Sequence, residues 1–90
     1  MEIEFDQNKR DVTLRERGLD FARAGEVLTG PVLTCEDARC DYGECRFITL
    51  GQLDRRIVVL VWTQRGSICR IISMRYANDR EKSRFSAFLG

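Results

Sequence analysis

The 90-residue chain is predicted to adopt an α+β fold, with two N-terminal helices, a four-stranded antiparallel meander and a C-terminal helix. Apolar residues recur at helical spacing as far as Leu28, and from Val32 onward they form short runs separated by polar turns. A chain of this length with 43% hydrophobic residues can bury one core but not a second. We therefore expect a single domain over residues 1–90, with helices packed on one sheet.

The two N-terminal helices are predicted from the residues that begin and end them. Asp6 can cap a helix over residues 7–17, and Gly18 follows where a left-handed residue is preferred. Asp20 can cap a second helix, which ends before Pro31. The expected buried face of that helix consists of Phe21, Ala24, Val27 and Leu28.

The four strands are expected over residues 32–36, 46–50, 56–62 and 67–72. The run from Ile57 to Trp62 is apolar without a break, which is typical of a central strand covered on both faces. Arg46 and Arg70 lie within otherwise apolar strands. Arg70 is expected to share its face of the strand with Ile68 and Ile72, so it needs an open sheet face or a buried acidic partner.

The final helix is predicted to begin at Asn78. Asn78 and Glu81 have the spacing of a capping box. Phe85, Phe88 and Leu89 are expected to form the buried face of the helix. The chain shows no internal repeat, linker or low-complexity tract.

The sequence predicts a cytoplasmic protein without membrane contact. No run approaches the roughly 18 to 20 consecutive apolar residues that a membrane helix needs. The N-terminus also lacks the basic start and the apolar core of a signal peptide.

The charge of the chain is divided between its halves. Residues 1–45 hold six basic and eleven acidic side chains, whereas residues 46–90 hold nine basic and three acidic ones. This asymmetry predicts a basic surface for an anionic partner and an acidic surface that either screens the basic one or meets a different partner. Thirteen of the fifteen cations are arginine, which donates to phosphate in pairs and stacks on bases. A GC-rich genome would explain the arginine excess but not the asymmetry, and RNA is the expected polyanion.

The chain contains no histidine. This excludes Ser-His-Asp and Cys-His catalysis, ribonuclease chemistry with paired histidines, and metal sites that contain histidine. Cleavage of a phosphodiester would then need arginines to stabilise the phosphorane and a Lys, Glu or Tyr to carry the proton.

Charged residues from separate elements are candidates for this chemistry. Those predicted to bind phosphate and stabilise the transition state are Lys9, Arg46, Arg65, Arg70 and Arg75. Glu44 is a candidate general base, and a salt bridge with a neighbouring arginine is its alternative role. Arg17 and Arg56 are expected to add contacts to RNA. A single such cation is more typical of a solvated or ion-paired surface, but the set favours a site.

The cysteines raise the alternative of a zinc site. Cys35, Cys40 and Cys45 are evenly spaced, and Cys69 is the fourth thiol. Structural zinc ligands usually cluster as two tight pairs at turns, so we expect free thiols, no metal and no cofactor. Trp62 is expected to lie in the core rather than to stack on a base.

Three segments of the chain form a recognisable pattern: Glu4-Phe5-Asp6 with Lys9, Gly43-Glu44 with Arg46, and Arg70-Ile71-Ile72-Ser73 with Arg75. Further residues of the pattern are Leu14, Gly18, Phe21, Ala24, Pro31, Gly51, Val59 to Val61, Thr63, Arg65, Ala77 and Glu81. Together they resemble the BrnT toxin family over nearly the whole chain.

The resemblance implies a RelE-like ribonuclease toxin of a type II toxin-antitoxin pair, which cleaves RNA and arrests growth. We expect this cleavage to need no metal ion. The resemblance also implies a BrnA antitoxin with a ribbon-helix-helix domain, and binding of operator DNA only through that antitoxin. The exposed acids of the first half are expected to meet a basic segment of the antitoxin.

The chain departs from the family pattern near the end of the first helix. BrnT-like sequences usually carry Asn, then Lys-His, where this chain has Thr13, Glu16 and Arg17. Phe85 stands in place of the usual Tyr and removes a hydroxyl donor. Alternatives to an active ribonuclease are therefore a weak or inactive corepressor that binds the antitoxin and, in a third interpretation, a zinc-bound adaptor.

Overall fold

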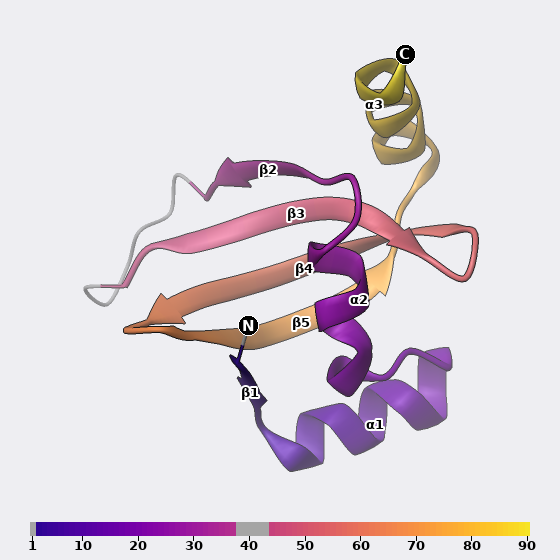
Figure 1. The fold of residues 1–90 in the computed structure, drawn as a ribbon. Coiled ribbons are helices and arrows are strands. Elements are labelled where there is room, and N and C mark those ends of the chain that lie inside the picture. The colour runs from indigo at the N-terminus through magenta and orange to yellow at the C-terminus, as the bar shows by residue number, and fades with distance from the viewer. Residues whose placement is uncertain (1, 38–43) are drawn as a thin grey trace.

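The computed structural model describes residues 2–37 and 44–90 and has a mixed α+β architecture. Its elements are β1 (Glu2–Phe5), α1 (Gln7–Arg17), the 3-10 helix η1 (Phe21–Arg23), α2 (Ala24–Leu28), β2 (Leu33–Glu36), β3 (Arg46–Leu53), β4 (Arg56–Arg65), β5 (Ile68–Tyr76) and α3 (Asp79–Leu89). The strands form one five-stranded sheet in the order β1-β5-β4-β3-β2 (Figure 1). The predicted antiparallel meander is confirmed as β2 to β5, with β4 at the centre.

The sequence prediction missed strand β1. This strand pairs in parallel with β5, so the sheet is mixed rather than purely antiparallel. Ile3 and Phe5 alternate with acids, but the run has only four residues and leads directly into the capped helix α1. The predicted ends of β3, β4 and β5 were also too early, because three or four residues beyond each of them, polar and apolar, continue the ladder.

The predicted capping residues begin and end the helices as expected. The Asp6 carboxylate accepts hydrogen bonds from the backbone N–H groups of Asn8 and Lys9, and Gly18 ends α1 with φ of 71°. The Asp20 carboxylate accepts from the N–H of Ala22, but the second helix starts as the 3-10 helix η1 before it becomes α2. None of the described helices is long and apolar enough to cross a membrane.

The first face of the sheet is covered by η1 and α2. The buried residues on this side are Leu19, Phe21, Ala24, Val27, Leu53, Val58, Leu60, Cys69, Ile71 and Met74. The ring of Phe5 on β1 meets Phe21 edge-on, at 5.9 Å between centroids. The buried face predicted for the second helix is therefore confirmed, and this side holds the larger part of the core.

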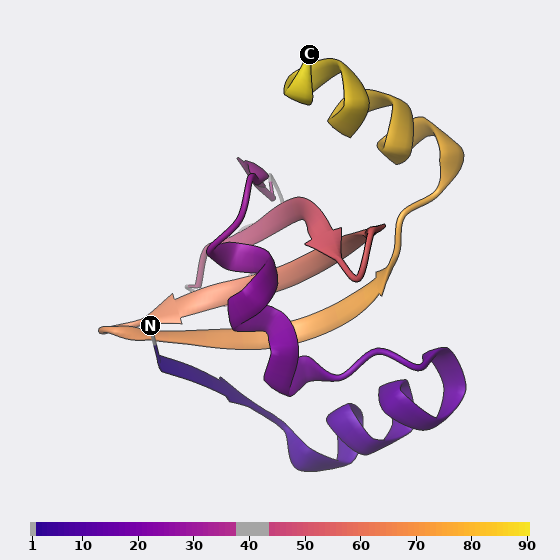
Figure 2. The same ribbon diagram turned by 45° about the vertical axis from the view of Figure 1, so that its right-hand side comes forward.

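Among the described elements, α3 alone covers the second face of the sheet, and it does so at one end. Phe85 is buried there against Leu50, Val59 and Ala77. The prediction that Phe88 and Leu89 are also buried was wrong, because both side chains are about half exposed. Helix α3 stands apart from α1 and α2 and rises away from the sheet toward its C-terminus (Figures 1 and 2). Its last turn therefore has little of the sheet to pack against.

A β-bulge interrupts the pairing of β4 with β5. Val61 pairs with Ser73 and Trp62 pairs with Ile71, so Ile72 has no partner on β4. Side chains alternate between the faces of a regular strand, and one extra residue reverses that alternation beyond the bulge. Two residues of β5 on opposite sides of Ile72 therefore share a face of the sheet when they are separated by an odd number of positions.

Gly51 allows α2 to approach the first face of the sheet. A Cβ atom at this position would lie 2.5 Å from Cγ1 of Val27 and 3.3 Å from Cγ1 of Val32. Val27 is itself buried in the core on this face. The absence of a side chain at Gly51 therefore sets the distance between α2 and β3.

We predict that Gly51→Ala destabilises the protein by about 1–3 kcal/mol, because Val27 must move in a packed core. The melting temperature should fall by about 4–8 °C for each kcal/mol. Gly30→Ala is the matched control, since the nearest atom to its Cβ would be the Val27 carbonyl oxygen at 3.8 Å. Equal thermal unfolding curves for the two variants would contradict this interpretation of Gly51.

Glu81 fixes the start of α3 to the sheet. Its carboxylate accepts from the backbone N–H of Asn78, and the Asn78 side chain accepts from the N–H of Glu81, which completes the predicted capping box. The same carboxylate accepts two hydrogen bonds of 2.8 Å from the Arg75 guanidinium on β5. Arg75 is the main cause that lowers the pKa of Glu81 to about 2, against the opposing effect of partial burial.

We predict that this carboxylate makes stability fall at acid pH. A carboxyl group whose pKa is lowered on folding contributes its full stability above its unfolded pKa, here about 4.5, and loses it as the pH approaches about 2. Because the Arg75 side chain is 42% exposed, we expect about 1–2 kcal/mol after solvent screening. Urea unfolding between about pH 6 and pH 3 should show a smaller pH dependence for Glu81→Gln than for the wild type. The curve for Glu16→Gln, at an exposed acid of α1, should run parallel to that of the wild type.

Candidate functional site

The second face of the sheet carries arginines from three strands. Arg46 on β3 pairs with Thr63 on β4, which in turn pairs with Arg70 on β5. Arg65 follows Thr63 by two residues, so its side chain projects from the same face. Directly cross-strand side chains lie about 4.5–5.5 Å apart at Cβ. The sheet thus brings together three arginines that are far apart in the sequence.

The bulge adds Arg75 to this face. Arg70 and Arg75 are five positions apart and would point to opposite faces of a regular strand. Because Ile72 is the extra residue, Arg75 pairs with Val59, which lies on the same face of β4 as Thr63. We call Arg46, Arg65, Arg70 and Arg75 the arginine face.

Most arginines of this face are held by carboxylates. Arg65 contacts Glu44 at 3.1 Å, Arg70 contacts Glu4 at 3.1 Å, and Arg75 binds Glu81 in a bidentate pair. The pair with Glu81 raises the pKa of Arg75. Among the described residues, no acid forms an ion pair with Arg46. For Arg70 the sequence predicted an open sheet face or a buried acid, and its partner Glu4 is a partly exposed acid, 38% accessible.

Glu44 takes the second of the two roles considered for it, a salt bridge to Arg65. The neighbouring backbone is fixed by Thr63, whose buried hydroxyl donates to the Cys45 carbonyl at 2.8 Å. Glu44 therefore lies beside the arginine face, although its carboxylate is engaged. Gly43, which precedes Glu44 in the pattern that resembles the BrnT family, lies outside the described residues.

Glu4 was not predicted to be a partner of the arginines. Its pairing with Arg70 in the parallel ladder places the two side chains on one face. The alternation of acids and apolar residues at positions 2–5 is the signal that could have found it. The identity of its partner depends on a pairing between the two ends of the chain.

Lys9 and Arg17 lie along the free edge of β5. β1 pairs with β5 only as far as Ile71, and α1 runs beside the strand beyond that point. The Lys9 ammonium donates to the carbonyl of the bulge residue Ile72 at 3.4 Å, and the Arg17 guanidinium donates to the Met74 carbonyl at 3.3 Å. These cations satisfy edge carbonyls that have no strand partner. They also line a pocket of about 390 Å³ between α1 and β5.

Arg56 lies at the opposite end of β4 from Arg65 and from the pairs of Thr63 with Arg46 and Arg70. It begins β4, whereas Arg65 ends it, and the ten residues of this strand span about 30 Å. Its guanidinium lies over the ring of Tyr76, 4.8 Å from the centroid. The residues predicted to bind RNA are thus divided between two regions of the molecule.

The charge asymmetry of the sequence does not persist as two separate surfaces. Glu4, Glu44 and the arginines they bind come from opposite halves of the chain. A further pair of this kind joins Arg23 to Asp54, and Arg23 also binds Glu26, so that it lowers the pKa of both acids. The fold therefore neutralises part of the basic half with acids from the first half.

The remaining candidate groups lie away from the arginine face. Cys35 and Cys45 are exposed and Cys69 is buried, whereas Cys40 lies outside the described residues. Within 2–37 and 44–90, no three His, Cys, Asp or Glu side chains are arranged to hold a metal ion. Trp62 stacks on Phe47 and donates from Nε1 to the Thr49 hydroxyl, and it packs against the core of the first face.

The arginine face can bind a phosphate group from several directions, because its guanidinium groups come from three neighbouring strands. A phosphate there would have to compete with the carboxylates that engage three of the four arginines. Arginine remains charged at any physiological pH, so the face can stabilise negative charge but cannot supply a proton carrier. That carrier would have to come from the neighbouring Lys9 or Glu44.

Comparison of the chain with known protein families identifies one family that it matches. The profile of the family described as the ribonuclease toxin BrnT of type II toxin-antitoxin systems matches residues 5–81. A search of curated proteins found no match to the chain. The family match includes every residue of the arginine face, together with Lys9, Glu44 and Glu81. The chain therefore belongs to the BrnT family of ribonuclease toxins of type II toxin-antitoxin systems.

Proposed function

We propose that this protein is a metal-independent, RelE-like endoribonuclease that arrests growth by cleaving RNA in the cytoplasm. The observation that carries the proposal is the arginine face, which gathers four permanent cations on one side of the sheet in a member of a ribonuclease family. With no histidine in the chain, charge stabilisation by arginine is the main catalytic resource that remains.

In the proposed reaction the 2′-hydroxyl of RNA attacks the adjacent phosphorus. A bond forms between the 2′ oxygen and phosphorus, and the bond from phosphorus to the 5′ oxygen of the next nucleotide breaks. Glu44 takes the proton of the 2′-hydroxyl once phosphate has displaced it from Arg65, and Lys9 returns a proton to the 5′ oxygen. The arginine face stabilises the extra negative charge of the phosphorane.

The four arginines should not contribute equally. Arg46 has no ion pair among the described residues, and Arg70 and Arg65 each meet their acid through one contact of 3.1 Å. Arg75 is engaged by two hydrogen bonds of 2.8 Å to a carboxylate that also caps α3. Phosphate therefore competes more easily for Arg46 and Arg70 than for Arg75, whose role is partly structural.

We predict that Arg46→Ala and Arg70→Ala each lower the rate of RNA cleavage by about 10²–10³, because each removes a donor to the developing charge. Arg75→Ala should lower the melting temperature more than either of them, because it also removes the partner of Glu81. The measurement is single-turnover cleavage of a labelled RNA by purified protein, with thermal unfolding of each variant.

Arg15→Ala is the matched control, an exposed arginine of α1 outside the arginine face. Its cleavage rate should equal that of the wild type, and added EDTA should leave the wild-type rate unchanged. Full activity of Arg46→Ala and Arg70→Ala would contradict the assignment of these residues, and loss of activity in EDTA would contradict metal independence.

Membership of the family implies an antitoxin partner. We propose that this partner is a BrnA-like protein with a ribbon-helix-helix domain, and that operator DNA is bound only through it. The exposed acids that are free of described ion pairs include Glu2, Asp6 and Glu16, which suits a basic antitoxin segment.

A second candidate function is a weak or inactive toxin that serves as a corepressor bound to the antitoxin. It is favoured by the carboxylates on Arg65, Arg70 and Arg75, which reduce the positive charge available to RNA. It is also favoured by Arg17, which is engaged at the edge of β5, and by Glu16 in the same pocket. The replacement of tyrosine by Phe85 does not bear on this choice, because Phe85 is fully buried between α3 and the sheet.

Expression of the protein without its antitoxin separates these two functions. We predict that the wild type arrests growth and fragments RNA, because no antitoxin blocks its arginine face. The Arg46→Ala variant should not arrest growth, because it lacks a donor to the developing charge. Harmless overexpression of a folded protein, together with tight operator binding that needs both partners, would instead support the corepressor.

The complex of this protein with its antitoxin should weaken as the salt concentration increases, if the acids of the first half contact the antitoxin.

A further inference from the structure

A second cationic pocket lies at the end of the sheet opposite Arg65. It has a volume of about 420 Å³ and is lined by Arg55, Arg56, Ile57, Tyr76 and Lys82. The residues come from the turn between β3 and β4, the end of β5 and the start of α3. We call it the hairpin pocket.

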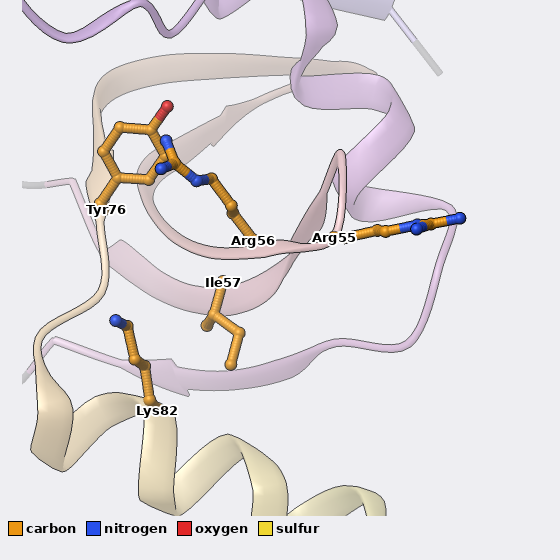
Figure 3. Close-up of a pocket in the computed structure, with 5 residues that line it drawn as sticks. All are labelled: Arg55, Arg56, Ile57, Tyr76 and Lys82. Carbon is orange, nitrogen blue, oxygen red and sulfur yellow. The ribbon is translucent and has the colours of Figure 1, made fainter.

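The cations of the hairpin pocket differ from those of the arginine face in their partners. No acid lines the pocket, and none of Arg55, Arg56 and Lys82 forms an ion pair in the part of the chain that the structure describes. Two of these cations, Arg56 and Lys82, extend toward the concave site and make it a region of positive potential (Figure 3). The pocket is therefore suited to an anion that the fold itself does not supply.

Arg56 and Tyr76 add a planar surface to this charge. Arg56 points toward the Tyr76 ring, and Lys82 extends from α3 into the space beside them, whereas Arg55 points away around the turn (Figure 3). Aromatic rings and guanidinium planes are the groups on which unpaired bases of RNA stack. Charge for a phosphate and a plane for a base thus lie side by side.

The turn that carries Arg55 and Arg56 is held in a demanding conformation. Asp54 and Arg55 have φ of 51° and 67°, a region that residues other than glycine seldom occupy. The Asp54 carboxylate is bound by the Arg23 guanidinium at 2.6 and 2.8 Å, and Arg23 is in turn held by Glu26 of α2. The helix on the first face thereby fixes the turn, so that Arg56 enters β4 beside Tyr76.

We propose that the hairpin pocket binds a nucleotide of a single-stranded RNA whose cleaved phosphodiester lies on the arginine face. Arg56 and Lys82 contact phosphate, and a base stacks on the plane formed by Arg56 and Tyr76. The inference rests on the proposed ribonuclease function, because it places two contacts on one substrate. The chemistry favours RNA over an acidic polypeptide, since the pocket offers a stacking plane and only one aliphatic side chain, Ile57.

The distance between the two regions makes the proposal testable by RNA length. Arg75 lies next to the pocket residue Tyr76, whereas Arg46 and Arg70 both pair with Thr63, seven residues along β4 from Arg56 and therefore about 23 Å away. A stacked strand rises about 3.4 Å per nucleotide, so about 4 nucleotides cannot join the hairpin pocket to a phosphodiester held by Arg46 and Arg70, whereas about 16 nucleotides can. Affinity should therefore depend on the hairpin pocket only for the longer RNA.

The experiment measures fluorescence anisotropy of labelled 2′-O-methyl oligoadenylates of about 4 and about 16 nucleotides, which lack the nucleophilic hydroxyl and are not cleaved. For the longer RNA, Arg56→Ala/Lys82→Ala should weaken binding at least about tenfold and reduce the salt slope by about 1.4, since each lost phosphate contact is worth about 0.7. Tyr76→Leu should also weaken binding about tenfold but leave the salt slope unchanged, because it removes stacking alone. Arg15→Ala should bind both RNAs like the wild type.

The outcomes separate this inference from the proposed function. If the double variant binds the longer RNA as the wild type does, the hairpin pocket is no RNA site, whatever the cleavage assay shows. If poly-glutamate competes with the longer RNA as well as unlabelled RNA of equal charge, the ligand class is wrong. If the protein cleaves no RNA but length-dependent binding is lost in the double variant, the pocket stands and the ribonuclease function fails. Near-ultraviolet circular dichroism and melting temperatures check that each variant is folded.

Discussion

The bulge at Ile72 is the constraint on which the proposed site depends. It reverses the alternation of side chains along β5, so that Arg70 and Arg75 share one face although they are five positions apart. The same shift places Met74 in the core of the first face and Tyr76, which is partly buried, against that core. The carbonyl of the bulge residue accepts a hydrogen bond from Lys9, which links α1 to this point. One extra residue thus arranges both the packing and the cations of the strand.

The ion pairs explain how so many arginines can lie on a small sheet. Repulsion among Arg65, Arg70 and Arg75 is relieved by carboxylates from β1, from the segment before β3 and from α3. These pairs are partly exposed, so they stabilise the fold only modestly and leave the arginines accessible to a stronger anion. Phosphate can form bidentate hydrogen bonds with a guanidinium, as the carboxylates do. The phosphates of RNA can therefore replace the carboxylates that hold these arginines in the free protein.

The two cationic regions have different physical characters. On the arginine face, most cations are neutralised in place, which suits a site where charge is needed only as a transition state develops. In the hairpin pocket, cations without described counterions stand beside a stacking plane, which suits binding in the ground state. The turn between β3 and β4 is tied by Arg23 to α2, so the shape of the hairpin pocket depends on packing across the first face.

The sequence by itself determined the fold class, the caps of the helices, the order of the four meander strands and the absence of histidine chemistry. These features depend on residues close together in the chain, where periodicity and capping act. It did not reveal strand β1, the exposure of Phe88, or the separation of Arg56 from Arg46, Arg65 and Arg70. Only the tertiary structure decided which arginines share a face and which acids hold them. The physical reason is that both depend on strand register between distant segments, and a single bulge changes that register without leaving a pattern in the local sequence.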